Sequence, residues 1–166
     1  MMKIMKTAIA LLALTAFFYG CNDDGTAEDY VGTWKVKTYV SPTENITYPL
    51  AAYSQQDYLV ITEKKLGLYI SVTLNSGAIK IYHCPNLDAS FEDSKITFAD
   101  GSTGTMELDG KTLTVTKKNS AGTVLYTRTL EKAADGAIDT TNTDSAVCGV
   151  MKSTSEEDVP SIFIEN

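Results

Sequence analysis

The chain has 166 residues, of which 43 % are hydrophobic and 21 % charged, and its formal net charge is −7. This length accommodates one ordinary domain with short appendages, and the composition is that of a globular chain rather than a disordered or multi-span membrane protein. Lys3 and Lys6 are the two charged residues of the first twenty, so removing that segment changes the net charge from −7 to −9. So acidic a chain lacks the Lys/Arg clusters that nucleic acid and anionic lipid require, which argues against both partners.

The N-terminus has the features of a secretory signal. A short basic start is followed by residues 7–18, an almost unbroken apolar run that is too short to span a bilayer. The run ends in Phe-Phe-Tyr-Gly directly before Cys21. This junction resembles the loosened lipobox of Bacteroidetes-type lipoproteins, which implies cleavage after residues 1–20 and acylation of Cys21. The alternative is a buried or disulfide-bonded cysteine that happens to follow an apolar run.

The next segment, residues 21–29, is polar and acidic and has no hydrophobic periodicity, which predicts a flexible linker. An acidic cluster behind a lipidated cysteine resembles the export signal of Bacteroidetes lipoproteins. The resemblance implies a protein held in the outer membrane by its lipid, with the cell surface as one destination. The alternative is a solvated linker that carries no address. In either case the lipid on Cys21 would make the membrane a partner, because several acyl chains anchor a protein stably.

The first predicted strand lies in residues 30–40 and contains Trp34, the only tryptophan of the chain. Alternation with period two predicts one inward and one wet face. The inward set is predicted to be Trp34, Val36, Thr38 and Val40, and the outward set Lys35, Lys37 and Tyr39.

Between residues 58 and 132, short alternating segments are separated by turn residues, which is typical of an antiparallel meander. The predicted strands are residues 58–62, 66–74, 78–83, 95–99, 103–108, 111–117 and 123–131. Pro85 breaks the strand before it, and residues 87–93 are predicted to be a connection. With the Trp34 strand the count is eight, which favours an all-β, eight-stranded antiparallel up-and-down barrel. A two-sheet sandwich would show the same alternation and stays open as the alternative.

A Gly-x-Trp sequence, here Gly32-Thr33-Trp34, opens the first strand of this meander. The pattern resembles the lipocalins and the lipocalin-like lipoproteins of Bacteroidetes, and the resemblance covers residues 30–132. It implies a barrel whose closed end is latched by an arginine of the last strand lying over the Trp34 indole. Arg128, the only arginine, lies in the eighth predicted strand. Such a cation–π contact is worth about 0.5 to 2 kcal/mol. The alternative is a core tryptophan and a solvated arginine.

The same resemblance implies a disulfide that pins the C-terminal tail near the fourth strand, which here would join Cys84 to Cys148. The bond would contribute about 4 kcal/mol in the chain-entropy model. Two free thiols are the alternative. The family also folds its first long loop over the barrel mouth, so Tyr48 and Tyr53 of this loop, together with Tyr58, are the candidate ligand contacts. Ordinary packing of the loop is the alternative for these tyrosines.

The tail, residues 133–166, is rich in Asp, Thr and Gly and does not have the pattern of the helix that the family places there. Its Asp-Thr-Thr and Asp-Ser-Ala sequences at residues 139 and 144 resemble the O-glycosylation site of Bacteroides. His83, the only histidine, stands beside Cys84, and adjacent strand residues point to opposite faces, so His83 is predicted to be structural. No catalytic residue, metal site or cofactor is predicted, and the chain is not expected to be an enzyme.

The leading hypothesis is an outer-membrane-anchored, lipocalin-like lipoprotein that binds a small hydrophobic or amphiphilic ligand without catalysis. The alternative is a solid barrel that serves as an interaction module or accessory subunit and binds a protein or glycan at the cell surface. The interior discriminates between them. A cavity of roughly several hundred Å³ beneath Tyr48 and Tyr53 favours the first, and a packed interior favours the second.

Overall fold

The structure, a computed structural model, describes residues 27–50, 54–74, 76–146 and 148. The predicted signal segment, Cys21, Tyr53 and the end of the tail lie outside the described residues. The regular elements are α1 (Ala27–Tyr30), β1 (Gly32–Val40), β2 (Asn45–Thr47), β3 (Gln56–Ile61), β4 (Lys65–Thr73), β5 (Ile79–His83), the 3-10 turn η1 (Pro85–Leu87), β6 (Ala89–Glu92), β7 (Lys95–Phe98), β8 (Thr103–Asp109), β9 (Thr112–Lys118), β10 (Val124–Lys132) and β11 (Asp144–Ser145).

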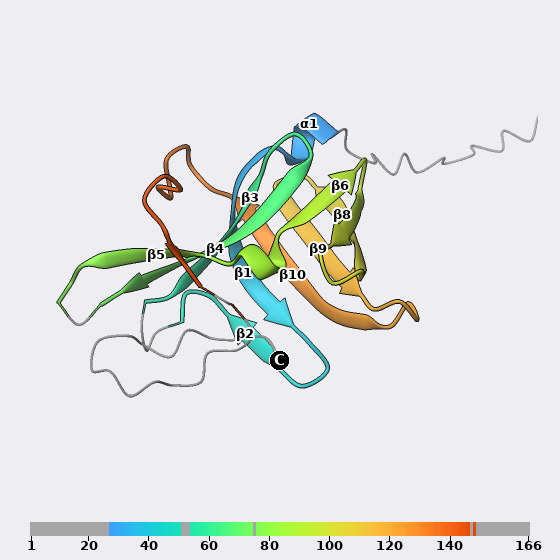
Figure 1. The fold of residues 1–166 in the computed structure, drawn as a ribbon, viewed down its shortest axis with the longest axis horizontal. Coiled ribbons are helices and arrows are strands. Elements are labelled where there is room, and N and C mark those ends of the chain that lie inside the picture. Colours follow the sequence, from blue (N-terminus) through green and yellow to red (C-terminus); the bar gives the residue numbers. More distant parts are fainter. Residues whose placement is uncertain (1–26, 51–53, 75, 147, 149–166) are drawn as a thin grey trace, which may run out of the picture.

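Eight strands close into a ring in the order β1, β3, β4, β6, β7, β8, β9 and β10, and β10 pairs again with β1 (Figure 1). Every pairing in the ring is antiparallel. The predicted all-β, eight-stranded up-and-down barrel is therefore confirmed. The two-sheet alternative is excluded, because closure joins all eight strands into one continuous sheet.

The membership of the ring differs from the prediction at one strand. Tyr69 faces His83 and Leu66 faces Ala89, so three steps along β4 correspond to six steps along the chain from β5 to β6. β5 and β6 therefore pair with different parts of β4, and the extra residues between them form η1. The prediction that residues 87–93 are a connection is wrong, because they contain β6. Its buried Ala89 and Phe91 alternate with exposed neighbours, as strand patterning requires.

The predicted faces of β1 are correct for its first half and wrong for its second. Val36 pairs with Leu130 but Thr38 pairs with Thr129, so Lys37 is an extra residue in a β-bulge. A bulge of one residue exchanges the two faces of the strand beyond it. Tyr39 consequently turns into the barrel and is 5 % exposed, whereas Val40 faces solvent.

The closed end, where β1 begins and α1 lies, is latched by a different cation from the predicted one. Trp34 stands opposite Lys132 in the β1–β10 ladder, and the Lys132 Nζ lies 4.6 Å from the indole centroid. Arg128 lies four residues before Lys132 in β10, opposite Tyr39, and its guanidinium lies over two tyrosine rings. The predicted Trp34–Arg128 contact is therefore wrong. The register of the ladder assigns this position to Lys132.

Gly32 and α1 complete the closed end. The Trp34 indole donates a hydrogen bond of 2.7 Å to the carbonyl of Tyr30, the buried last residue of α1. Residues 27–29, predicted to belong to the flexible linker, instead form the start of this short helix. Gly32 has a φ of +131°, and a Cβ there would lie 2.7 Å from the Lys132 Nζ. The predicted role of Gly32 at the latch thus has a steric basis: it leaves room for the lysine.

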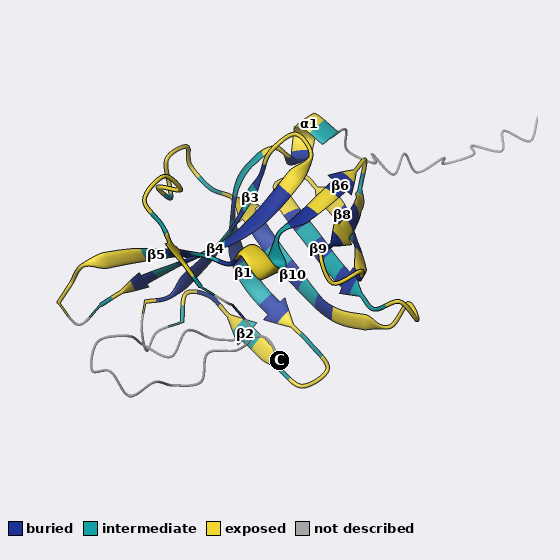
Figure 2. Cartoon of the chain, viewed as in Figure 1, coloured by how far each residue is buried: buried dark blue, intermediate teal, exposed yellow. Residues whose placement is uncertain are grey.

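Buried residues recur along the strands of the ring, where Figure 2 marks them in dark blue. The larger buried cluster fills the barrel and includes Tyr30, Trp34, Val36, Leu59, Ile96, Phe98, Met106, Leu113, Val115 and Leu130. A second cluster lies on β4, β5 and the tail, and comprises Leu68, Ile70, Val72, Tyr82, Cys84 and Cys148. The division of the core into two clusters follows the division of β4 between its two partners.

Replacing Gly32 by Ala is expected to lower the free energy of unfolding by about 1 to 3 kcal/mol, because it strains the backbone and displaces Lys132 from Trp34. Urea denaturation followed by Trp34 fluorescence measures the loss. Gly122→Ala is the matched control, since Gly122 has a φ of +81° but nothing within 4 Å of the added methyl. Equal losses in the two variants would show that the Lys132 contact contributes nothing.

Candidate functional site

Two strands change partners at the same end of the barrel, and this creates an opening. The first four residues of β1 pair with β3, but its last three pair with β2. Residues 69–73 of β4 likewise pair with β5 instead of β6. We call this hairpin of β5 with residues 69–73 the arm; it projects away from the ring in Figure 1. The opposite end from the latch is therefore the open end of the barrel.

A small pocket lies between the arm and the ring. It is lined by Tyr39, Tyr48, Asp57, Leu68, Ile70, Leu87, Arg128 and Cys148. Its free volume is about 10 Å³, roughly the space that one water molecule needs. The apolar part of the lining comes from β4, η1 and the tail, and the aromatic and charged part comes from β1, the residue after β2, β3 and β10. A ligand larger than a water molecule therefore requires part of the wall of this pocket to move.

Arg128 provides the strongest polar feature of the pocket. Its side chain points inward from β10 and is 5 % exposed. The guanidinium lies 4.5 Å from the Tyr126 ring centroid and 5.5 Å from that of Tyr39, and its Nη1 donates a hydrogen bond of 3.0 Å to the Tyr126 hydroxyl. Tyr39 reaches this position only because of the bulge at Lys37. Aromatic faces attract a desolvated cation, so the two tyrosines hold Arg128 at the pocket wall.

Three consecutive polar residues at the start of β3 are also buried, namely Gln55, Gln56 and Asp57. The Gln56 amide donates to the carbonyl of Val36 at 2.8 Å, at the point where the β1–β3 ladder ends. It replaces a ladder bond that the divergence of the strands removes. The Gln55 amide donates to Asp57 Oδ1 at 3.0 Å, which fixes that carboxylate at the pocket. The pocket therefore presents both a cation and a carboxylate.

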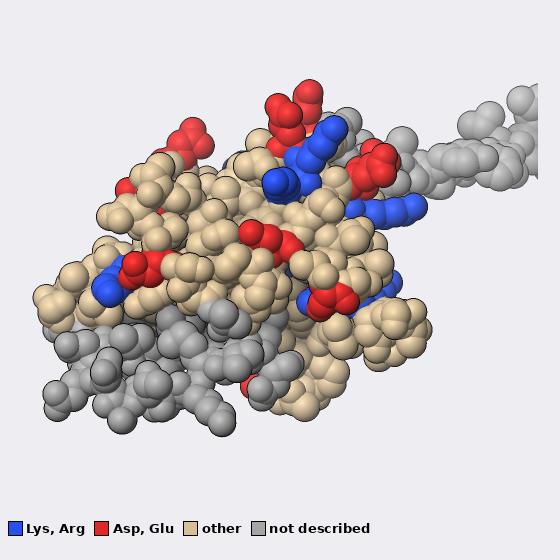
Figure 3. Space-filling view, in the orientation of Figure 1, with Lys and Arg blue, Asp and Glu red and all other residues tan. Residues whose placement is uncertain are grey.

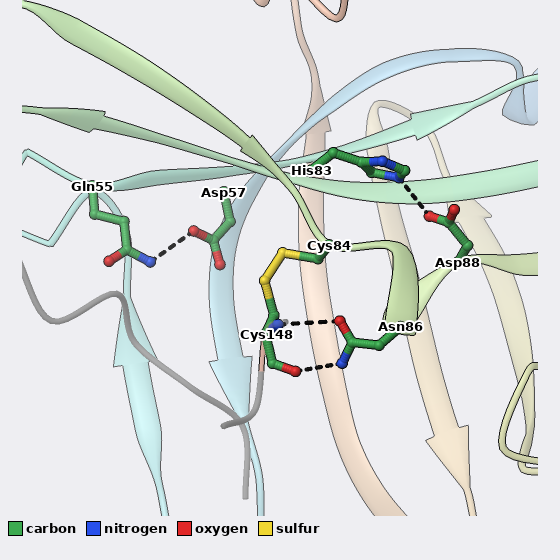
Figure 4. The surroundings of a disulfide bond; sticks show 7 residues. All are labelled: Gln55, Asp57, His83, Cys84, Asn86, Asp88 and Cys148. Carbon is green, nitrogen blue, oxygen red and sulfur yellow. Dashed lines mark hydrogen bonds and ion pairs between the residues drawn. A yellow bond between two sulfur atoms is a disulfide. The ribbon is translucent and has the colours of Figure 1, made fainter. Parts of the chain in front are cut away.

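The structure joins Cys84 and Cys148 in a disulfide, as the family resemblance implies. Asn86 holds the same part of the tail: its Oδ1 accepts from the Cys148 N–H at 3.1 Å, and its Nδ2 donates to the Cys148 carbonyl (Figure 4). β11 adds a short parallel pairing with the edge of β5. The tail thus reaches the pocket and contributes Cys148 to its wall.

The structure separates the three candidate tyrosines. Tyr48 is buried and lines the pocket, and its contact with a ligand stays a prediction. Tyr53 lies outside the described residues. Tyr58 lies on the outer face of the barrel, paired with Lys35 and Tyr69, while its neighbour Leu59 points inward. The prediction that Tyr58 contacts a ligand at the mouth is therefore wrong for this pocket, because strand alternation turns the side chain away.

His83 lies on the same outer face and fits the structural role predicted for it. Its Nε2 is 2.8 Å from Asp88 Oδ1, and its ring stacks on Tyr69 at 4.7 Å. Burial raises the pKa of Tyr69, and the Asp88 carboxylate raises it further. These contacts tie η1 to β4 and β5. Within the described ranges, no group of three or more His, Cys, Asp or Glu residues is arranged to hold a metal ion.

A second buried cation lies inside the barrel near the open end. Lys117 Nζ is 4.4 Å from the Phe98 ring centroid and pairs with Asp100 Oδ2 at 3.0 Å. A hydrogen bond from the Ser102 hydroxyl is the largest cause that lowers the pKa of Asp100, and Lys117 adds to it; the pKa falls to about 2. Lys117 also lies 5.9 Å from the Tyr126 ring centroid, on the ring that Arg128 contacts.

The surface gives no sign of a charged docking face on the side shown in Figure 3, where basic and acidic side chains are mixed among uncharged ones. None of the helices in the described part of the chain is long and apolar enough to cross a membrane.

Sequence reasoning missed Arg128, Asp57 and Tyr39 as pocket residues. A charged residue among alternating apolar strand positions was the available signal for the first two. The bulge that turns Tyr39 inward left no sequence signal that we can identify.

No protein-family model and no curated protein matches the chain. Among solved structures it is similar to a mutant of the fluorescent protein UnaG, with 16 % sequence identity and a TM-score of 0.34. The match covers 65 % of this chain and 99 % of that chain. So distant a likeness carries no functional argument. The barrel itself is established by the strand pairings of this chain.

The Asp100 cluster predicts an acid-sensitive component of stability. The pKa of Asp100 is about 2 in the folded chain and 3.8 without the fold. A lowered carboxyl pKa stabilises the fold above the unfolded value, so this contribution is expected to disappear as the pH falls from about 4 to about 2. Urea titrations across this range measure it. In Asp100→Asn, the part of the pH dependence due to this carboxyl should be absent, and an unchanged profile would refute the assignment.

Proposed function

We propose that the chain binds a small amphiphilic ligand at the open end of the barrel. The observation that carries this proposal is Arg128, a guanidinium buried between two tyrosines at the wall of a pocket. Burying a charge is unfavourable unless paired or hydrogen-bonded groups offset the loss of hydration. A cation kept at a pocket wall is suited to bind a ligand with an anionic or strongly accepting group.

The lining chemistry specifies the ligand further. Leu68 and Ile70 offer an apolar surface for the body of the ligand, and Tyr39 and Tyr48 offer aromatic faces with polar edges. Asp57 Oδ1 accepts from Gln55 and could also accept from a donor on the ligand. The ligand proposed is therefore a compact amphiphile with an apolar body and an acceptor group for Arg128. A purely hydrocarbon ligand would make no polar contact with the charged groups of this wall.

The proposed site differs in position from the expected one, which was a cavity inside the barrel. Trp34, Met106, Leu113 and Leu130 are all less than 3 % exposed and fill the interior. The ligand is therefore placed at the mouth, where moving the cover enlarges the pocket. The packed interior also specifically favours the alternative function, a solid barrel that binds a protein or glycan through its surface.

A charge-assisted hydrogen bond is worth about 1.5 to 3 kcal/mol, so Arg128→Met is expected to weaken binding of the anionic, apolar probe 1-anilinonaphthalene-8-sulfonate at least about tenfold. Fluorescence titration measures the affinity. Lys132→Met is the matched control, since it removes a cation at the closed end and should leave the affinity unchanged. Equal affinities in both variants and the parent would refute Arg128 as the binding group.

The natural ligand is accessible to native mass spectrometry of protein purified from its own host. A co-purified small molecule that is absent from Arg128→Met supports the amphiphile-binding function. Recovery of protein without a bound molecule, together with failure to bind the probe, favours the solid-barrel alternative.

The location that we propose is the outer membrane, with the chain anchored through a lipid on Cys21. The support is the sequence alone, namely the basic start, the apolar run and the cysteine that ends it. Cys21→Ser is expected to abolish both acyl labelling and membrane fractionation in the host. Persistence of either in the variant contradicts the anchor. The proposed function is ligand binding without catalysis.

A further inference from the structure

The tail covers the apolar inner face of the arm beside the pocket. Residues 144–146 and Cys148, which we call the strap, run along the edge of β5 and turn toward the pocket. Cys148 and Ala146 pack with the second core cluster, whose members Leu68, Ile70, Val72 and Tyr82 are at most 8 % exposed. Two of these residues, Leu68 and Ile70, also line the pocket with Cys148. The strap is therefore a wall of the proposed binding site.

Besides this apolar packing, few polar contacts between described residues hold the strap. β11 forms only two residue pairs with β5, Asp144 with Tyr82 and Ser145 with His83. The Ala146 N–H donates to the His83 carbonyl at 2.9 Å, and Lys80 lies 3.5 Å from Asp144. That ion pair is about half exposed and contributes little. A two-residue pairing at a sheet edge is only marginally stable by itself.

The remaining attachments converge on Cys148. The disulfide to Cys84 ties the strap to the end of β5, and the Asn86 side chain binds both the N–H and the carbonyl of Cys148. Figure 4 shows these attachments together, just after β5 ends. The covalent bond keeps the strap close to its place whenever the short pairing opens. Without the disulfide, the strap gains conformational freedom, and its few hydrogen bonds do not offset this gain.

We propose that the Cys84–Cys148 disulfide is a redox-controlled fastening of the strap, and that its reduction opens the binding pocket. A dithiol supplies two electrons and two protons, the S–S bond becomes two thiols, and the dithiol becomes a disulfide. Cys84 and Cys148 are buried, so the dithiol reaches the bond when the strap opens locally. Release of the strap uncovers Leu68 and Ile70 and enlarges the pocket next to Arg128. The inference rests on the proposed binding function, because it concerns the regulation of that site.

The test compares oxidised protein with protein reduced by dithiothreitol and has two readouts. In the reduced protein, the affinity for 1-anilinonaphthalene-8-sulfonate is expected to rise about tenfold. The amides of His83 and Ala146, which lie at the pairing of β5 with the strap, are expected to exchange hydrogen faster. Unchanged Trp34 emission and slow exchange of the Leu130 amide show that the barrel stays folded. Cys148→Ser treated with dithiothreitol controls for the reagent, because it has no bond to reduce and should behave alike with and without it.

The variant Asn86→Ala tests the strap while the Cys84–Cys148 disulfide stays intact. It removes both side-chain hydrogen bonds to Cys148, and the affinity for the probe is expected to rise several-fold. This variant keeps the inference testable if complete reduction unfolds the chain.

The outcomes separate the strap from the binding function. Faster exchange at β5 with tighter probe binding supports both. Faster exchange with unchanged probe affinity overturns control of the pocket by the strap, as does full reduction with no change in either readout. If the probe binds neither form, the binding function fails in this test. The exchange rates at His83 and Ala146 then decide alone whether the disulfide fastens the strap.

Discussion

The structure depends on one constraint, which is that each strand must find hydrogen-bond partners for both of its edges. Eight strands meet this requirement by closing into a ring. β1 and β4 meet it in a different way, because each gives one part of its length to the ring and the other part to an extra strand. Both changes of partner occur at the end opposite the Trp34–Lys132 latch. The open end and its pocket are therefore consequences of strand pairing and not additions to a finished barrel.

The divergence of the strands also explains why polar groups are buried at the open end. Where β1 leaves β3, the Val36 carbonyl accepts from the Gln56 side chain instead of a neighbouring strand. Nearby, Asp57 and Arg128 are buried at the wall where the arm leaves the ring. Buried polar groups need partners, and a region without regular ladder bonds is one in which side chains must provide them. The same groups give the pocket its charged chemistry, so the features that stabilise the opening also make it suitable for a polar ligand.

The sequence predicted the architecture well because alternation and turn residues are local signals. It gave seven of the eight ring strands, their approximate limits and the antiparallel order. Its errors arise where register decides the result. Arg128 and Lys132 share a face of β10. The family resemblance favoured the arginine, but the ladder places Lys132 opposite Trp34. The bulge at Lys37 reverses the face of Tyr39, and β6 is too short for its two buried residues to stand out from a loop. Each error concerns a pairing with a distant strand, which a local pattern does not contain.

The two ends of the barrel use the same kind of contact for different purposes. At the closed end, Lys132 lies over Trp34 beside a glycine that no side chain can replace without displacing it. At the open end, Arg128 lies over Tyr126 and Tyr39, beside a wall formed by the tail. The first contact joins the first and last strands where the ring is complete. The second lies where the ring is incomplete and the cover is attached through Cys148 and Asn86, so movement there does not require the barrel to open. A packed core is consequently compatible with ligand binding, provided that binding takes place at the end where β1 and β4 leave the ring.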